Sequence, residues 1–220
     1  MKPFLPILLS AALLAACGGT PPPPDWKLNA VGLLDHAQMR WLEGDSRSSE
    51  LALTKARNEI AKSGRIDLLA RAELSACAAR IASLDFAACA AFEKLAPDAG
   101  FGDKAYAHFL AADWEGLDAK ALPPHYADLV TARDAAGANR AVAEIKEPLP
   151  RLIGAALLFR TGRATPETLG VAIDTASERG WRRPLLAWLE VQHKRAQTAG
   201  DSEAARLLRK RIDFVLGTPQ

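Results

Sequence analysis

The chain has almost no sequence signal for β-structure. It contains no Asn-Gly or Asp-Gly dipeptide, the pairs that favour two-residue hairpin turns, and no long run alternates between apolar and polar residues. Apolar residues instead recur with the helical spacing i, i+3, i+4 and i+7, as in the segment that ends at Trp41. We therefore predict an all-α fold of about ten helices joined by short turns.

The sequence also lacks the short motifs that mark the common catalytic and metal sites. No HExxH, GxSxG, Walker A or dinucleotide-binding glycine pattern is present. The 4 histidines lie far apart, and none has a second histidine or an acid at the spacing of a metal site. We therefore expect no catalytic residue, no metal ion and no cofactor.

An apolar run near the N-terminus is too short to cross a membrane. It extends from Phe4 to Leu14 after the positive charge of Lys2, and its length of about 11 residues falls short of the roughly 18 that a membrane span needs. This length suits the hydrophobic region of a secretory signal peptide. The tetrapeptide Leu-Ala-Ala-Cys at 14–17 ends the run and resembles the lipobox of bacterial lipoproteins.

This resemblance predicts how the N-terminus is processed. In bacterial lipoproteins the lipobox cysteine is acylated and the chain is cut directly before it, so residues 1–16 are expected to be a signal peptide and Cys17 the lipidated residue. Gly18 follows, where an aspartate would favour the inner membrane, so the resemblance implies an outer-membrane anchor that faces the periplasm. Residues 17–26 include four consecutive prolines and are expected to form an extended tether. An ordinary cleaved signal peptide is the alternative.

Two cysteines remain beyond the lipobox. An even number of cysteines in an oxidising compartment favours a disulfide. We expect helices at about 67–82 and 85–95, which would place Cys77 and Cys89 at equal distances from the turn between them. Alanine residues beside both cysteines would let the helices approach closely enough for a bond. We therefore predict a Cys77–Cys89 disulfide between two antiparallel helices, with two buried free thiols as the alternative.

One short turn motif occurs twice. Gly-Asp-Ser at 44–46 and again at 200–202 separates two predicted helices, with glycine ending one helix and aspartate or serine capping the next. The second copy continues as Glu-Ala-Ala and resembles the turn of tetratricopeptide repeats, although no regular period of about 34 residues is visible. We predict an irregular array of antiparallel helical hairpins over residues 27–217, with a sub-boundary near 113–124. A plain helical bundle is the alternative.

Charge is divided unevenly along the chain. Residues 17–150 contain 15 Lys and Arg against 19 Asp and Glu, whereas residues 151–220 contain 12 against 7. This positive excess is too small to indicate nucleic-acid binding, but it suits contact with an acidic partner or an anionic surface. Arg206, Arg209 and Lys210 lie on the polar side of the last expected helix, and we predict that they contact a partner. A solvated helix face without a partner is the alternative.

Three aromatic residues border the irregular stretches of the sequence. Trp114 and Tyr126 flank the segment that contains Gly and Pro-Pro near residue 120, and Trp181 follows a glycine that ends a helix. We expect these three side chains to be exposed and to contact a partner. Trp41 and Trp188 lie at core spacing and are expected to be buried.

These features together predict a lipid-anchored envelope protein that acts as a protein-interaction or scaffold module. Stacked helix pairs leave grooves that suit an extended peptide or another helix, so the expected partner is an envelope protein. The second alternative is an enzyme that acts on an envelope polymer such as peptidoglycan. Lytic transglycosylases, the helical enzymes of this kind, typically carry serine after the catalytic glutamate, and this chain has no Glu-Ser pair. A carrier of a lipid or small ligand in a cavity between helices is the third alternative.

Overall fold

The computed structural model describes residues 22–217, and its helices confirm the predicted all-α class. The expected signal peptide 1–16 and Cys17 lie outside the described residues, as does the first half of the expected tether, up to residue 21. Helix α1 begins at Asp25, so Asp25 and Trp26 belong to the helical body and not to the tether. Within the described residues, no helix has the length and apolar character needed to cross a bilayer.

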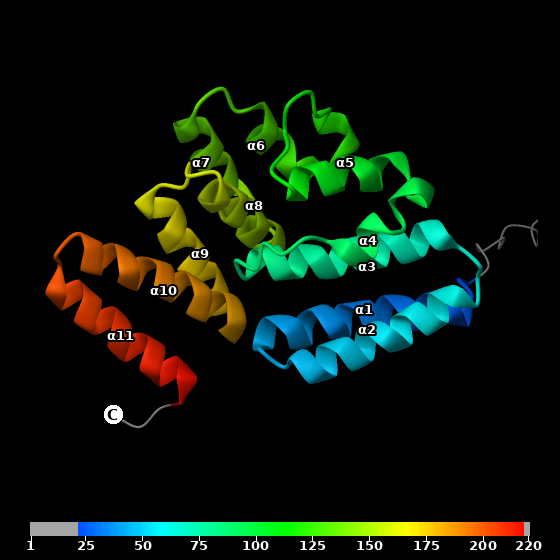
Figure 1. Cartoon of the computed structure of the whole chain (residues 1–220), viewed down its shortest axis with the longest axis horizontal. Coiled ribbons are helices and arrows are strands. Elements are labelled where there is room, and N and C mark those ends of the chain that lie inside the picture. Colours follow the sequence, from blue (N-terminus) through cyan, green and yellow to red (C-terminus); the bar gives the residue numbers. More distant parts are fainter. Residues whose placement is uncertain (1–21, 218–220) are drawn as a thin grey trace, which may run out of the picture.

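Eleven α-helices and three short 3-10 helices make up the described chain (Figure 1). Helices from the two ends of the chain are long, whereas those in the middle are short. The bounds are α1 Asp25–Glu43, α2 Ser46–Ala61, α3 Ile66–Ala82, α4 Ala90–Glu93, η1 Ala96–Asp98, α5 Phe101–Leu110, η2 Ala119–Ala121, η3 Pro124–Tyr126, α6 Ala127–Thr131, α7 Ala135–Glu144, α8 Pro148–Arg160, α9 Pro166–Glu178, α10 Arg182–Thr198 and α11 Ser202–Leu216.

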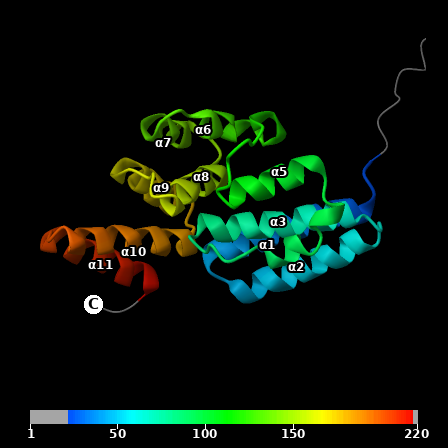
Figure 2. The same ribbon diagram turned by 45° about the horizontal axis from the view of Figure 1, so that its top comes forward.

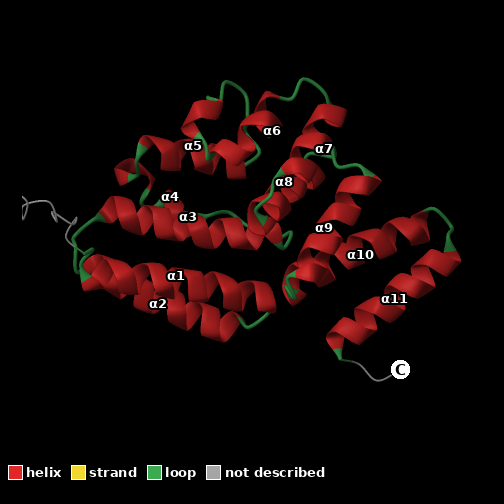
Figure 3. Ribbon diagram, turned by 180° about the vertical axis from the view of Figure 1, so that it is seen from behind, coloured by secondary structure: helices red, strands yellow, loops and turns green. Residues whose placement is uncertain are grey.

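Helices far apart in the sequence pack side by side. α1 and α2 form a hairpin, α3 packs against both, and α8 packs against α3 although residues 83–147 separate them. From α8 the chain continues as α9, α10 and α11, each packed against the helix before it (Figures 1 and 2). The short helices α4–α7 cover α3 and α8, and the view from behind shows only helices and loops in the described part (Figure 3). This is an irregular array of hairpins, as predicted.

Both Gly-Asp-Ser turns have the local structure that their sequence predicts. Gly44 has a φ of 99° and Gly200 a φ of 73°, which residues with a Cβ atom rarely adopt. The carboxylates of Asp45 and Asp201 each accept a hydrogen bond of 2.9 Å from the N–H three residues on. Glycine therefore ends one helix and aspartate caps the next in both hairpins.

One buried cluster runs through most of the described chain. Its largest fully buried side chains are Trp188, Tyr126, Phe109, Leu42, Leu74, Leu110, Leu129, Leu152, Leu157, Leu158, Leu169 and Leu189. Residues on both sides of 113–124 belong to this cluster, and the sub-boundary expected there stays a prediction. Helix α8 is central, as its apolar sequence predicts, because every residue from Leu152 to Leu158 is buried. A Cβ at Gly154 would lie 3.1 Å from a side-chain methyl of Val142, so a larger residue there would require Val142 to shift by a few tenths of an ångström.

The middle of the chain is less helical than predicted. The helix expected over 85–95 is reduced to α4, and residues 85–89 are not helical. Leu84 has a φ of 60°, which turns the chain, and the Arg80 guanidinium donates a hydrogen bond of 3.0 Å to the Ala88 carbonyl. A side-chain hydrogen bond from α3 therefore satisfies the Ala88 carbonyl, which in a helix would have accepted a backbone hydrogen bond.

The chain from Pro124 to Glu144 is also divided into short helices. α6 ends at Thr131, and α7 begins at Ala135. The Asp134 carboxylate caps α7 by accepting a hydrogen bond of 2.6 Å from the Gly137 N–H, so the capping residue marks a helix start inside a run that looks continuous in the sequence.

A cationic side chain joins the last part of the array to the first. The Arg183 guanidinium of α10 lies 3.9 Å from the ring centroid of Trp41, and its Nε donates a hydrogen bond of 2.7 Å to the Trp41 carbonyl. Its Nη2 also donates to the Ser46 hydroxyl at 2.6 Å. Cation–π contacts of this kind stabilise folded proteins most when the cation is desolvated. The Arg183 guanidinium is partly desolvated, since burial lowers its pKa.

Candidate functional site: a groove between α3 and α5

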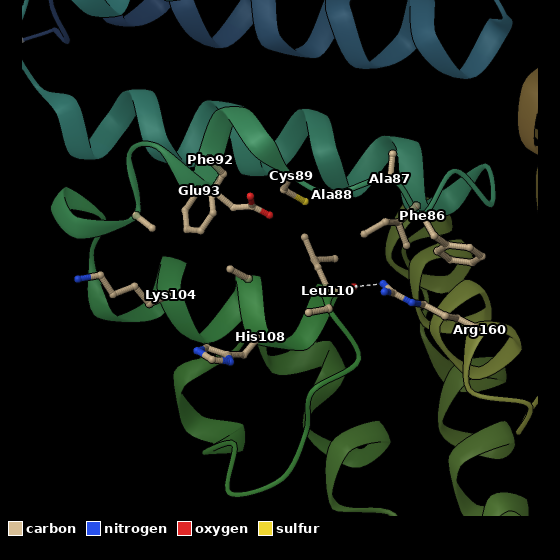
Figure 4. Close-up of a pocket in the computed structure, with 14 residues that line it drawn as sticks. Phe86, Ala87, Ala88, Cys89, Phe92, Glu93, Lys104, His108, Leu110 and Arg160 are labelled. Atoms are coloured by element: carbon tan, nitrogen blue, oxygen red, sulfur yellow. Dashed lines mark hydrogen bonds between the residues drawn. The ribbon is translucent and has the colours of Figure 1, made fainter.

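A groove lies between helix α5 and the segment that follows α3. Its volume is about 510 Å³, within the range typical of ligand sites (Figure 4). One wall is formed by residues of the 86–93 segment and the other by α5, while Arg160 reaches in from the end of α8. The apolar lining consists of Ile81, Phe86, Ala87, Ala88, Cys89, Phe92, Ala96, Ala107, Leu110 and Ala111. We call this site the α3–α5 groove.

A pair of cysteines, one in α3 and one in the 85–89 segment, holds this segment against α3. Cys77 is buried on α3, and Cys89 lines the groove, with the two Cα atoms 5.7 Å apart, which is disulfide distance. Cys89 directly precedes α4, so the predicted link between two antiparallel helices is wrong in its geometry. The pair joins a helix to a non-helical segment, because the chain after Leu84 does not return as a helix. It therefore fixes one wall of the groove.

This wall carries backbone groups that a helix would not expose. The Ala87 N–H donates to the Asp85 carboxylate at 3.1 Å, and the Ala88 carbonyl accepts from Arg80. The Ala87 carbonyl and the Ala88 N–H have no hydrogen-bond partner among the described residues, and both alanines are exposed. Because such groups need a partner from water or from a ligand, this wall can form backbone hydrogen bonds with a bound chain.

Two positive charges border the groove without a carboxylate partner. The Arg160 guanidinium lies 5.5 Å from the Phe86 ring centroid and donates to the Leu110 carbonyl at 3.5 Å. The Lys104 ammonium donates to a carbonyl at 3.1 Å. Neither cation lies within ion-pair distance of an acid in the described part of the chain, and Glu93 is the one carboxylate that lines the groove. The site therefore favours a ligand that supplies negative charge.

The groove offers little for catalysis of glycoside cleavage, because that reaction commonly needs a pair of carboxylates and Glu93 stands alone. Four other glutamates of the helical body are exposed and lie outside the groove: Glu144, Glu147, Glu178 and Glu190. No group of three or more His, Cys, Asp and Glu side chains could hold a metal ion among residues 22–217.

The expected exposure of two aromatic side chains is wrong. Tyr126 is 1 % exposed and Trp181 is 4 % exposed, because the backbone at their irregular positions turns both rings into the core. The Tyr126 ring packs against Phe109 with centroids 4.3 Å apart, and burial raises the pKa of Tyr126. Trp114 is partly buried, and its Nε1 donates to the Phe109 carbonyl at 2.9 Å. Trp188 is fully buried, as predicted.

The basic residues expected to contact a partner are exposed on α11, outside the α3–α5 groove. Arg206 pairs with Glu203 at 2.7 Å, and Arg209 lies 3.4 Å from Glu190. Lys210 is exposed beside them. Their role in partner binding stays a prediction.

Sequence reasoning did not find most of the groove. Phe86, Lys104 and Arg160 are separated in sequence, and Arg160 joins the lining because α8 packs against α3. One signal was available, since the expected Cys77–Cys89 link already placed the segment after residue 84 along α3.

Comparisons with known proteins found no matching family model, no matching curated protein and no matching solved structure.

Proposed function

We propose that this protein is a lipid-anchored interaction module of the bacterial envelope, which faces the periplasm from the outer membrane and binds an extended segment of a partner protein. The binding site is the α3–α5 groove. The observation that carries the proposal is the non-helical wall of this groove, where the exposed residues Ala87 and Ala88 carry backbone groups without partners among the described residues and border an apolar surface. The lipobox at 14–17 supports the location.

The dimensions of the groove suit a short segment. A helix rises about 1.5 Å per residue, so the stretch from Lys104 in α5 to its C-cap Ala111 covers about 11 Å. An extended chain advances about 3.3 Å per residue, and three to four of its residues would fit beside this wall. Phe101 lies one turn before Lys104 and is 77 % exposed, which lengthens the apolar surface.

The charges of the groove specify the segment further. Lys104 and Arg160 would each attract a carboxylate, and a guanidinium can form two parallel hydrogen bonds with one. The apolar lining would receive the side chains between them. The preferred ligand is therefore an extended segment with apolar residues in its centre and an acidic residue at each end.

The geometry favours this ligand over a lipid or small-molecule cargo. Ala87, Ala88 and Ala111 are exposed at the groove, so an acyl chain bound there would keep part of its surface in water. A carrier needs to remove most of the apolar surface of its cargo from water. A peptide needs no such enclosure, because its backbone is satisfied by hydrogen bonds.

Site-specific photocrosslinking tests the proposal. A photoreactive residue at Ala88 or Ala111 is expected to trap one discrete envelope protein in cells, whereas the same residue at the exposed Ala136 of α7 should not. The crosslinked stretch of the partner, made as a synthetic peptide, should bind the purified mature chain with micromolar affinity in fluorescence anisotropy.

A groove-filling variant provides the control. Ala111→Trp should weaken peptide binding by about tenfold or more, and Ala136→Trp should leave it unchanged, with equal helicity by circular dichroism. Equal trapping from all three positions, or binding that survives Ala111→Trp, would contradict the proposal.

A further inference from the structure

A second groove lies between the hairpin α8–α9 and the hairpin α10–α11. Its volume is about 690 Å³, and Phe159, Val191, Ala204 and Leu208 form much of its apolar surface. All four side chains are only partly buried, so apolar area stays open to solvent. We call this site the C-terminal groove.

Three basic side chains lie in or beside the C-terminal groove without ion-pair partners. Lys194 and Arg195 line it from α10 and are exposed. Arg211 lies on the same side of α11 as Ala204 and Leu208, because residues three, four and seven apart share a helix face. Arg211 donates to a serine hydroxyl at 3.5 Å, and none of the three cations lies within ion-pair distance of an acid in the described chain.

Two acids near these three cations offset only part of their positive charge. The Asp201 carboxylate accepts the capping hydrogen bond of α11. The pKa of Glu167 is lowered chiefly by hydrogen bonds from its own backbone N–H and from Thr165, and only then by the charge of Arg195. The groove therefore keeps an excess of positive charge, in line with the 12 Lys and Arg against 7 Asp and Glu of residues 151–220.

The walls of the C-terminal groove determine which shape of ligand fits. The α10 and α11 walls are helical, with their backbone hydrogen bonds made inside each helix, so they offer an extended chain no backbone partners. A bound helix satisfies its own backbone and needs only side-chain contacts. From Val191 to Ala199 the α10 wall covers about 12 Å, which matches roughly two turns of a helix.

We propose that the C-terminal groove binds an amphipathic helix of a partner protein, whose apolar stripe is flanked by Asp and Glu. The apolar stripe would lie on Phe159, Val191 and Leu208, and the acidic flanks would face Lys194, Arg195 and Arg211. This is the helix-in-groove mode of recognition, with charge complementarity that also increases the rate of association. It is separate from the α3–α5 groove, which suits an extended chain.

Two matched peptides test this inference on the purified mature chain. Both have about 15 residues with leucine at i, i+3, i+4 and i+7, and one carries glutamate and the other lysine at the remaining positions. The acidic peptide is expected to bind at least tenfold more tightly in fluorescence anisotropy, to gain helicity by circular dichroism, and to weaken as salt rises. Equal binding of the lysine peptide would overturn the inference, because apolar attraction alone would then explain it.

Variants locate the binding. Lys194→Glu combined with Arg195→Glu should reduce affinity for the acidic peptide by about tenfold or more. Arg182→Glu changes an exposed basic residue at the start of α10, outside the groove, and should alter affinity less than about twofold. Ala199→Trp, which fills the groove at an exposed position, should also block binding. Unchanged affinity in both groove variants, or an equal loss in Arg182→Glu, would refute the site.

Discussion

The first and last hairpins of the array share a turn but not their surroundings. In the α1–α2 hairpin the Asp45 N–H donates to the Arg40 carbonyl at 2.8 Å, and in the α10–α11 hairpin the Asp201 N–H donates to the Ala196 carbonyl at 3.0 Å. The buried residues of α2 are Ser49, Ala52, Leu53, Ala56 and Ile60, whereas those of α11 are Ala205 and Ile212. The same turn therefore occurs in two hairpins whose second helices are buried to different extents.

The difference shows that the turn determines the hairpin and that the neighbouring helices determine how much of it is buried. The α1–α2 hairpin packs against α3 and is tied to α10 through Trp41 and Arg183. Helix α11 packs chiefly against α10, which leaves Leu207 51 % exposed and Phe214 79 % exposed. Regions with few buried apolar contacts open at lower free energy than the rest of a protein, so α11 is expected to open first.

The largest effect should come from a matched pair of cavity-forming substitutions. Ile60→Ala in α2 and Ile212→Ala in α11 remove the same atoms from sites that are 3 % and 0 % exposed. Ile60→Ala should lower the free energy of unfolding by about 2–5 kcal/mol. The loss for Ile212→Ala should be smaller, because it cannot exceed the free energy of opening α11 alone.

Chemical denaturation followed by circular dichroism gives these free energies, and native-state hydrogen exchange shows which helix opens. Equal losses for the two variants would contradict the comparison, since α11 would then unfold only together with the whole domain.

Removal of the cysteine pair should affect a third region and leave the two hairpins alone. Cys77 and Cys89 are 12 residues apart, and closing a loop of this size contributes about 3 kcal/mol in the chain-entropy model. We predict that the double variant Cys77→Ser with Cys89→Ser increases hydrogen exchange in residues 85–93 and weakens peptide binding in the α3–α5 groove.

Thiol labelling of the denatured, unreduced protein is the prior control for this experiment. Two free thiols would show that no bond forms. Increased exchange at both Gly-Asp-Ser turns would show instead that the pair supports the whole array.

The smallest effect concerns the capping carboxylate of the first turn. The pKa of Asp45 is lowered, chiefly by a hydrogen bond from the Ser48 side chain. The folded state therefore binds this proton less tightly than the unfolded state, so the stabilising contribution of Asp45 is present above about pH 3.8 and is lost as the pH falls further.

Asp45→Asn should keep the cap and reduce the loss of stability at acidic pH, because asparagine caps helices without titrating. Thermal unfolding measured from about pH 2.5 to about pH 6 detects this change. A variant that loses stability at acidic pH as steeply as the original protein would disprove the assignment to Asp45. Asp201→Asn, treated in the same way, shows whether the second turn responds alike.

The elements that could be predicted from sequence are those determined by near neighbours in the chain. Gly44 and Asp45 mark a turn because their own backbone preferences and hydrogen bonds suffice, and the apolar run from Leu152 to Leu158 identifies a central helix. The helix expected over 85–95 does not form over its full length, because Arg80 donates a tertiary hydrogen bond to the Ala88 carbonyl that no local sequence pattern indicates. The inward direction of the Tyr126 ring depends on the same kind of distant packing.

The candidate site was predictable only through the cysteines. Cys89 is one groove residue that the sequence had already linked to another helix. Lys104 and Arg160 gave no signal, since an exposed basic residue on a helix usually faces solvent alone. They line the same groove because α8 packs against α3 across residues 83–147.

The last turn of α8 places two neighbouring residues in two different grooves. Phe159 lines the C-terminal groove, and Arg160 lines the α3–α5 groove. A partner that carries an extended acidic segment and an acidic helix on one flexible chain would therefore occupy both through a short connection. Once the first segment is bound, the second meets its groove at an effective concentration that can reach the millimolar range. Two contacts that are individually weak would then produce a long-lived complex by avidity.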